Sequence, residues 1–361
     1  MGANRRELLG GIAGAIAGIA FTGCRLGGAA LAQAPQLSQG QRRREVVVNG
    51  KRARTVDVHA HCHIPEATAL MGVKENFPAL VIGPERIKAM DEQGIDIEAL
   101  SINPIFWGKA DPDLARQVVK LQNEKLAEIC AKEPERFVGL ASVALQHPEL
   151  AAEQLEEAVK RFGLRGTLIG GSVNGEELAD PKFHPFWAKA EQLGALVFIH
   201  PQGTPEVTAT GRLKGSGGLD NVIGNPLETT IALSHLIFEG TLDRFPAVKI
   251  CGAHAGGYLP SYAARSDKGC ETFPARCTVA LKKKPSEYMR QLYYDSMVFT
   301  PEGLRHLIAE VGVSQIVMGT DFPFPWTKTA VDHILDTPGL SDADRAAMLG
   351  ETAARLLGIK A

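Results

Sequence analysis

The sequence predicts a (β/α)8 TIM barrel with an N-terminal hairpin extension, and three observations support this. Eight apolar runs alternate with amphipathic, helix-like stretches within about 300 residues. These runs are continuously apolar, which is typical of parallel strands buried on both faces. No glycine-rich phosphate turn follows the first run, and this absence favours a barrel over a doubly wound sheet.

The expected elements can be placed in chain order. The strands are TVDVHAH (55–61), IEALSI (97–102), FVGLASV (137–143), GTLIGG (166–171), ALVFIH (195–200), VKICGAH (248–254), LYYDSMV (292–298) and QIVMGTD (315–321). The clearest helices between them cover 111–132, 148–162, 226–243, 301–311 and 341–357, several of which begin at Pro, Ser or Asp. Before the first strand, Asn49-Gly50 marks a two-residue hairpin that we expect to cover the barrel floor.

The N-terminal segment is expected to be a targeting signal. Residues 1–34 are predicted to be a Tat-type signal peptide and short tail, because Arg5 and Arg6 precede a short Gly/Ala-rich apolar run. Cleavage after Ala32 would release a chain that contains the barrel, residues 41–361, into the periplasm with no stable membrane insertion. The alternative is a membrane anchor formed by an uncleaved signal or a lipidated Cys24, although the apolar run is short for spanning a bilayer.

Composition and charge restrict the partners. The chain has 361 residues, is 45% hydrophobic and carries a formal charge of -2, without a basic stripe. Nucleic acid is therefore not an expected partner, and a small-molecule carboxylate is. Cys270 and Cys277 are close enough in sequence for a loop disulfide, but spacing alone leaves their pairing open.

Metal-ligating residue types end several of the expected strands. His59 and His61 end the first strand, His200 the fifth and Asp321 the eighth. Alternate residues share one face of a strand, and the carboxyl ends of barrel strands meet at one mouth. These four side chains are expected to bind a divalent metal ion, with water at the open positions. His63 lies one step beyond the pair and is expected to line the pocket without binding the metal.

His254 ends the sixth strand and is the expected general acid/base beside a metal-activated water. Its neighbours Gly252, Gly256 and Gly257 are expected to let a substrate approach it. The alternative roles are a fifth metal ligand or an orienting residue. The remaining histidines are interpreted as surface or packing residues: His147, His184, His235, His306 and His333.

Motifs along most of the chain resemble the amidohydrolase superfamily, specifically its aminocarboxymuconate semialdehyde decarboxylase-like branch. The resemblance runs from about Thr55 to Gly358, through LSINP, RFVGLASVALQHPELA, FIHPQG, DRFPAVKICGAHAGGYLP and MGTDFPFPW. It implies that His59, His61, His200 and Asp321 bind the metal and that His254 is the catalytic base. The metal is usually zinc in this branch, so zinc is expected here, with manganese as the alternative. The resemblance also implies nonoxidative C–C cleavage with release of CO2, and a homodimer.

Two departures from the family pattern and one agreement with it bear on the number of metals and on the substrate. Binuclear members carry a carboxylated lysine after the fourth strand, whereas GTLIGGSVNG has no lysine, so one metal is expected. The arginine-bearing insertion that grips a substrate carboxylate in the family's decarboxylase is missing, and the corresponding link holds only Arg86. Arg265 aligns with an arginine that reaches substrate across the dimer interface in relatives; a surface salt bridge is the alternative.

Aromatic residues after two strands are expected to hold a planar conjugated substrate. They are Phe106 and Trp107 after the second strand, and Phe324 and Trp326 after Asp321. Packing between loops is the alternative for Trp107.

Three functions fit these residues. The first is a metal-dependent nonoxidative decarboxylase of a conjugated or aromatic carboxylic acid. The second is a hydrolase of a lactone or amide that uses the same site. The third, a periplasmic metal- or solute-binding protein, is disfavoured because a base beside four ligands has no use in storage.

Overall fold

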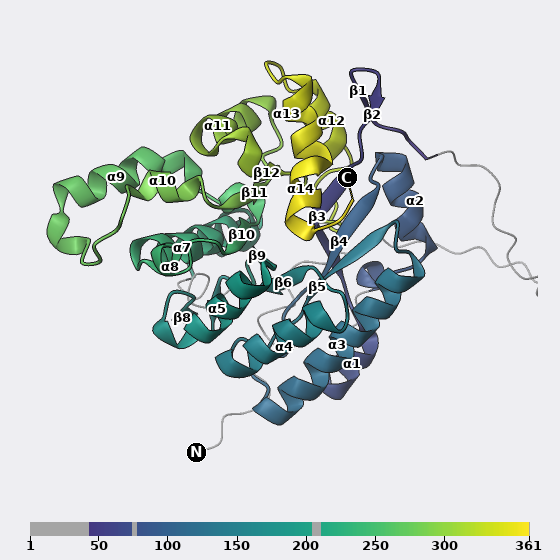
Figure 1. The fold of residues 1–361 in the computed structure, drawn as a ribbon, viewed down its shortest axis with the longest axis horizontal. Coiled ribbons are helices and arrows are strands. Elements are labelled where there is room, and N and C mark those ends of the chain that lie inside the picture. The colour runs from purple at the N-terminus through teal and green to yellow at the C-terminus, as the bar shows by residue number, and fades with distance from the viewer. Residues whose placement is uncertain (1–42, 74–77, 204–210, 361) are drawn as a thin grey trace, which may run out of the picture.

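A computed structural model describes residues 43–73, 78–203 and 211–360, and a barrel of eight parallel strands dominates it (Figure 1). The predicted signal segment, with Cys24, lies outside the described residues. The barrel strands are β3 (Val56–Cys62), β4 (Ile97–Ile102), β5 (Phe137–Ala141), β6 (Gly166–Ile169), β9 (Leu196–Ile199), β10 (Lys249–Gly252), β11 (Tyr293–Asp295) and β12 (Ile316–Val317). They neighbour one another in chain order, and all eight coincide with the strands predicted from the apolar runs.

Backbone hydrogen bonds close the barrel between its first and last strands. The Val58 amide donates to the Met318 carbonyl over 3.0 Å, and the Asp321 amide donates to the His59 carbonyl over 2.8 Å. The His61 amide in turn donates to the Phe322 carbonyl over 2.7 Å. Residues some 260 positions apart in the sequence therefore lie side by side, and the predicted ligands of the first and eighth strands meet.

Helices surround the strands. They are α1 (Pro65–Leu70), α2 (Pro84–Gln93), α3 (Pro112–Lys132), α4 (Pro148–Lys160), α5 (His184–Leu193), α7 (Asn225–Phe238), α8 (Thr241–Arg244), α9 (Ala263–Thr272), α10 (Pro285–Met289), α11 (Pro301–Val311), α12 (Ala330–Asp336), α13 (Asp342–Ala346) and α14 (Thr352–Leu357). Side chains cap several of the predicted starts: Asp111 accepts from the Leu114 amide at α3, and Thr300 accepts from the Gly303 amide at α11.

Two predicted helices are interrupted. The segment expected as one helix over 226–243 divides into α7 and α8, because Gly240 adopts φ 76° between them and ends the first helix. The segment 341–357 begins at the capping residue Ser341 as expected, but a π-helical turn, Ala347–Glu351, separates α13 from α14. Periodicity shows the buried face of such segments without showing where the hydrogen-bond pattern changes.

The hydrophobic core has two layers. Inside the barrel, Val58, Leu140 and Phe198 belong to one buried cluster. Between the strands and the helices, a larger cluster includes Trp187 and Leu236. Because both faces of the strands are covered, their sequences are apolar throughout, and polar groups concentrate where the strands end.

Short hairpins flank the barrel. The predicted N-terminal hairpin is present as β1 (Val47–Val48) and β2 (Lys51–Arg52), and a second one, β7 (Ser172–Val173) with β8 (Glu176–Glu177), follows β6. Arg52 donates to the Asp96 carboxylate over 2.5 Å. Since Asp96 directly precedes β4, the first hairpin lies at the amino ends of the strands, opposite the mouth that contains His61.

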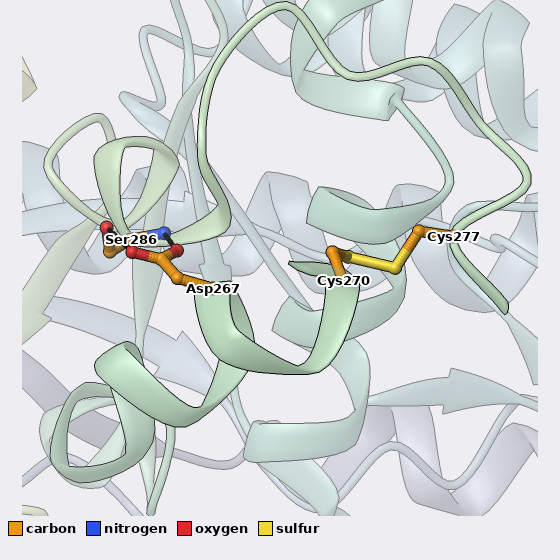
Figure 2. Close-up of a disulfide and its surroundings, with 4 residues drawn as sticks. All are labelled: Asp267, Cys270, Cys277 and Ser286. Carbon is orange, nitrogen blue, oxygen red and sulfur yellow. Dashed lines mark hydrogen bonds between the residues drawn. A yellow bond between two sulfur atoms is a disulfide. The ribbon is translucent and has the colours of Figure 1, made fainter. Parts of the chain in front are cut away.

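The connection between β10 and β11 forms an excursion that holds α9 and α10, which project away from the barrel strands (Figure 1). Figure 2 shows the disulfide between Cys270 and Cys277 at its tip, with an S–S distance of 2.01 Å. Asp267 also accepts hydrogen bonds from the backbone amide and the hydroxyl of Ser286, over 2.9 and 2.7 Å. The disulfide ties α9 to the loop that follows it, and the bonds between Asp267 and Ser286 tie α9 to α10.

Within the part of the chain that the structure describes, no helix combines the length and the apolar character needed to cross a bilayer.

Candidate metal centre

The first strand supplies two adjacent ligands. His59 and His61 on β3 are fully buried, and their Nε2 atoms lie 3.1 Å apart. Barrel closure brings Asp321 to them: its Oδ1 lies 3.1 Å from Nε2 of His59 and 3.0 Å from Nε2 of His61. Strand alternation and barrel topology therefore place these three side chains together, as predicted.

His200 at the end of β9 completes the cluster. Its Nε2 lies 3.2 Å from Nε2 of His61 and 3.8 Å from Oδ1 of Asp321. One donor atom from each of His59, His61, His200 and Asp321 falls within 4.8 Å of the others, and all four residues are buried. The structure thus brings together the four predicted ligands.

Two further side chains orient the histidine rings. Asp295, the last residue of β11, accepts from Nδ1 of His59 over 2.7 Å. Ser101 on β4 donates its hydroxyl proton to the Ala60 carbonyl, so its oxygen accepts from Nδ1 of His61 over 3.0 Å. Protons held on Nδ1 leave the Nε2 lone pairs facing the cluster, which is the arrangement that metal-ligating histidines require.

The electrostatics of the cluster fit a cation. Burial lowers the pKa of His61 to about 4 and that of His200 well below its ordinary value, so both imidazoles are neutral. Burial would lower the pKa of His59 as well, but Asp321 and Asp295 outweigh it and raise that pKa to about 10. Burial would raise the pKa of Asp321, yet His59 and the neighbouring histidines hold it well below its usual range.

The raised pKa of His59 and the lowered pKa of both Asp321 and Asp295 have one cause: the two buried carboxylates favour a positive charge in the cluster, which a bound cation would supply in place of a proton on His59. Oδ1 of Asp321 is buried and accepts no hydrogen bond from the described residues. Three imidazole nitrogens and one carboxylate oxygen that converge in this way suit a divalent metal ion such as zinc or manganese.

His254 lies beside the cluster in a strained turn after β10. Its φ is 53° and that of Ala255 is 56°, both in the left-handed region that is uncommon for such residues. Asp295 holds the turn, because its carboxylate accepts from the backbone amides of His254 and Ala255 over 2.9 and 2.8 Å. Nε2 of His254 lies 3.7 Å from Oδ2 of Asp321, and the side chain is 17% exposed. The ring therefore faces both the cluster and the accessible space.

The glycines around His254 also have a packing role. A Cβ on Gly257 would lie 2.0 Å from the Pro226 carbonyl oxygen, and one on Gly256 would lie 2.6 Å from the Tyr294 ring. A Cβ on Gly252 would lie 2.8 Å from Leu233. These glycines allow the turn to pack closely against α7 and β11, a role that the sequence did not indicate, and Gly257 also borders the cavity that His254 lines.

The predicted aromatic substrate residues lie in different surroundings. Trp107 is 1% exposed and donates its indole N–H to the Val143 carbonyl over 2.8 Å, so it packs in the core. Phe106 is half-buried, with its ring centroid 6.1 Å from that of His63. Phe324 is half-exposed, and its ring centroid lies 6.1 Å from that of the ligand His61.

Trp326 lines a cavity of about 400 Å³ together with His254. Arg265 is exposed on α9, in the projecting excursion. Arg86, the arginine of the link after the first strand, is buried: it pairs with Glu98 over 2.6 Å and donates to the His61 carbonyl over 2.8 Å. It supports the end of β3 and is not available to a substrate.

Sequence reasoning missed Asp295, which contacts both the ligand His59 and the turn of His254. A signal was present, because a charged residue interrupts the seventh apolar run, LYYDSMV; in the structure this aspartate ends β11, as Asp321 follows β12. Ser101 was also missed. A serine within an apolar strand gives no comparable signal.

His63 is buried and close to the site, with its Nε2 3.1 Å from the Thr68 hydroxyl. This contact agrees with a residue near the pocket that does not bind metal.

Comparisons with known proteins agree on one family. The amidohydrolase family matches residues 56–359. A 2-amino-3-carboxymuconate-6-semialdehyde decarboxylase from Dictyostelium discoideum is 33% identical over 276 residues, which cover 76% of each chain.

Solved structures give the same result. The structure of 5-carboxyvanillate decarboxylase from Sphingomonas paucimobilis matches with a TM-score of 0.77 and 26% identity, covering 85% of this chain and all of the other. A dihydroxybenzoic acid decarboxylase from Polaromonas sp. JS666, with bound manganese and the inhibitor 2-nitroresorcinol, matches with a TM-score of 0.75 and 28% identity. That match covers 85% of this chain and 97% of the other.

Proposed function

The chain belongs to the amidohydrolase family, and on that basis we propose that it is a metal-dependent nonoxidative decarboxylase of a conjugated or aromatic carboxylic acid. One observation carries the proposal: His254 lies 3.7 Å from Asp321, a member of the four-residue metal cluster, and lines an open cavity. A site that combines metal ligands, a general acid/base and an adjacent cavity is typical of an enzyme. The related decarboxylases support the choice of reaction.

In this reaction the C–C bond to the carboxylate breaks, CO2 leaves and the remaining carbon gains a proton. His59, His61, His200 and Asp321 would hold the metal, which supplies Lewis acidity and neutralises anionic substrate oxygens when bound. Nε2 of His254 is placed to carry the proton to the carbon that loses its carboxylate. Asp295 keeps this imidazole in position through the backbone of the turn.

The experiment that tests this proposal is CO2 release from hydroxybenzoate and muconate-type acids by the metal-loaded protein. Parallel assays of ring opening of lactones and hydrolysis of amides cover the hydrolytic use of the same site. We expect CO2 release that is lost in a His254→Ala variant. Ring opening or amide cleavage without CO2 release would contradict the decarboxylase.

For the metal, we propose zinc, with manganese as the alternative. Imidazole nitrogens with one carboxylate suit both ions, and the manganese in the Polaromonas decarboxylase supports the second. Elemental analysis of protein purified without added metal distinguishes them.

We propose that the protein is a homodimer in which Arg265 of one subunit reaches the substrate of the other. Its exposure on the projecting helix α9 supports this role. Light scattering coupled to size exclusion tests the dimer. Mixing Arg265→Ala with His254→Ala subunits tests the shared site, because one intact site per mixed dimer should restore activity.

For localisation, we propose Tat export to the periplasm. The Cys270–Cys277 disulfide supports this, because disulfides persist in oxidising compartments. Cell fractionation of the wild type and of an Arg5→Lys/Arg6→Lys variant tests it. Retention of the variant in the cytoplasm is expected, and equal export of both would contradict the proposal.

A further inference from the structure

The cavity beside His254 has a wall of aromatic and aliphatic side chains. Its volume is about 400 Å³, and it lies between the turn after β10, the start of α7 and the helix α11. Phe299 and Trp326 form one side, with ring centroids 6.1 Å apart and an angle of 32° between the rings. Leu307 and Val222 add aliphatic surface. A wall of this kind suits a planar, conjugated ligand.

The aromatic wall is exposed and strained. Phe299 is 53% exposed and Trp326 is 43% exposed, although large aromatic side chains are usually buried. Phe299 also adopts φ 59°, an outlier for a bulky residue. Strain and exposure at the rim of a cavity are typical of side chains held in place for a ligand.

A polar corner lies within the same cavity. His306 on α11 and Ser261 are joined by a hydrogen bond of 3.1 Å between Nε2 and Oγ, and both line the cavity. After this bond is made, a hydroxyl and an imidazole still have hydrogen-bonding capacity between them. His254 is only 17% exposed while His306 is exposed, so the base lies at the inner end of the cavity and the pair lies nearer the mouth.

The charges of the residues that line the cavity further restrict the class of ligand. Among the described residues that line this cavity there is no Asp, Glu, Lys or Arg. The cavity wall of one subunit therefore supplies no cation that would favour a second carboxylate on the substrate. A neutral hydroxyl, in contrast, can exchange hydrogen bonds with His306 and Ser261.

We propose that His306 and Ser261 select substrates that carry a neutral hydroxyl group remote from the carboxylate that is removed. The proposal rests on the proposed function, since it assumes that the reacting carboxylate lies next to His254. It assigns a binding role to His306, which the sequence alone indicated as a surface or packing residue.

The structure offers a binding assay that does not depend on turnover. Trp107 and Trp187 are 1% and 0% exposed, whereas Trp326 is 43% exposed and lines the cavity. Indole fluorescence of the metal-loaded full chain should therefore change when the cavity fills. A Trp326→Phe variant should lose this signal. The probes are benzoate, 4-hydroxybenzoate and benzene-1,4-dicarboxylate, which differ only in the group opposite the first carboxylate.

We expect 4-hydroxybenzoate to bind about fivefold more tightly than benzoate, as one net hydrogen bond implies. We expect the dicarboxylate to bind less tightly than 4-hydroxybenzoate, because the pair selects a neutral hydroxyl group. His306→Ala should reduce the fivefold ratio to about one, Ser261→Ala should reduce it, and His306→Gln should restore part of it. His235→Ala is the matched control, because it removes another exposed histidine and should leave the ratio unchanged.

Equal ratios in the wild type and His306→Ala, or tightest binding of the dicarboxylate, would overturn the proposal. A ratio that depends on His306 in a protein that releases no CO2 from hydroxybenzoates would support the polar pair and contradict the proposed function. The two failures are therefore distinguishable.

Discussion

Replacing Asp295 by Asn tests how the metal cluster and the base are held together. Oδ2 of this carboxylate accepts from Nδ1 of His59 and from the His254 amide, over 2.7 and 2.9 Å. Oδ1 accepts from the amides of Ala255 and Met297, over 2.8 and 3.2 Å. An asparagine fits the space, but whichever way its amide turns, its NH2 group faces two donors.

The expected loss of stability in Asp295→Asn follows from the number of hydrogen bonds that Asp295 accepts. Two of the four hydrogen bonds are lost in either orientation, and a hydrogen bond to a charged group contributes about 1.5–3 kcal/mol. We expect the free energy of unfolding to fall by about 3–6 kcal/mol. The loss of the negative charge that orients His59 should also lower metal affinity by about 10–100-fold.

Two measurements check these values: urea unfolding in the presence of a chelator, and metal affinity by competition with a chelating dye. Asp332→Asn is the control, because this carboxylate pairs with Arg44 at a half-exposed position and its change should cost about 1 kcal/mol or less. If Asp295→Asn bound metal as tightly as the wild type and unfolded at the same urea concentration, the reasoning about Asp295 would be refuted.

Three further predictions concern the metal and its support. His200→Ala should abolish CO2 release and lower metal affinity by more than about 100-fold, the upper end of the loss expected for a residue that only supports a ligand. His235→Ala should do neither. Equal metal retention by the two variants would contradict the ligand set. Arg86→Met should lower the free energy of unfolding by about 3–5 kcal/mol, because it leaves Glu98 buried without its partner, and adding Glu98→Met should recover part of the loss in the same denaturation assay. Removing the metal with a chelator should stop CO2 release, and adding back zinc or manganese should restore it; undiminished turnover of the metal-free protein would rule out a metal-dependent reaction.

Much of the fold was predictable because the barrel imposes a simple pattern on the sequence. Strands buried on both faces must be apolar, so a polar residue at the end of a run, such as His200 or Asp321, stands out. Since all the carboxyl ends meet at one mouth, the ligands could be assigned to one site without knowing any distance.

Other features depend on contacts between distant segments, which a single sequence does not show. Asp295 was missed although it ends a strand, because its importance comes from the histidine and the turn that it contacts. His306 was interpreted as a surface or packing residue, because periodicity does not say which helix face borders a cavity. The role of Gly257 depends on the approach of Pro226, from a helix elsewhere in the chain.

The most direct test of the central claim is the number of metal ions bound per chain. The full protein would be loaded with zinc or manganese, dialysed exhaustively and measured by elemental analysis, alongside an Asp321→Ala variant. The convergence of three imidazoles and one carboxylate predicts one ion per chain in the wild type and far less than one in the variant. No retained ion in the wild type, or equal retention by the two proteins, would contradict it.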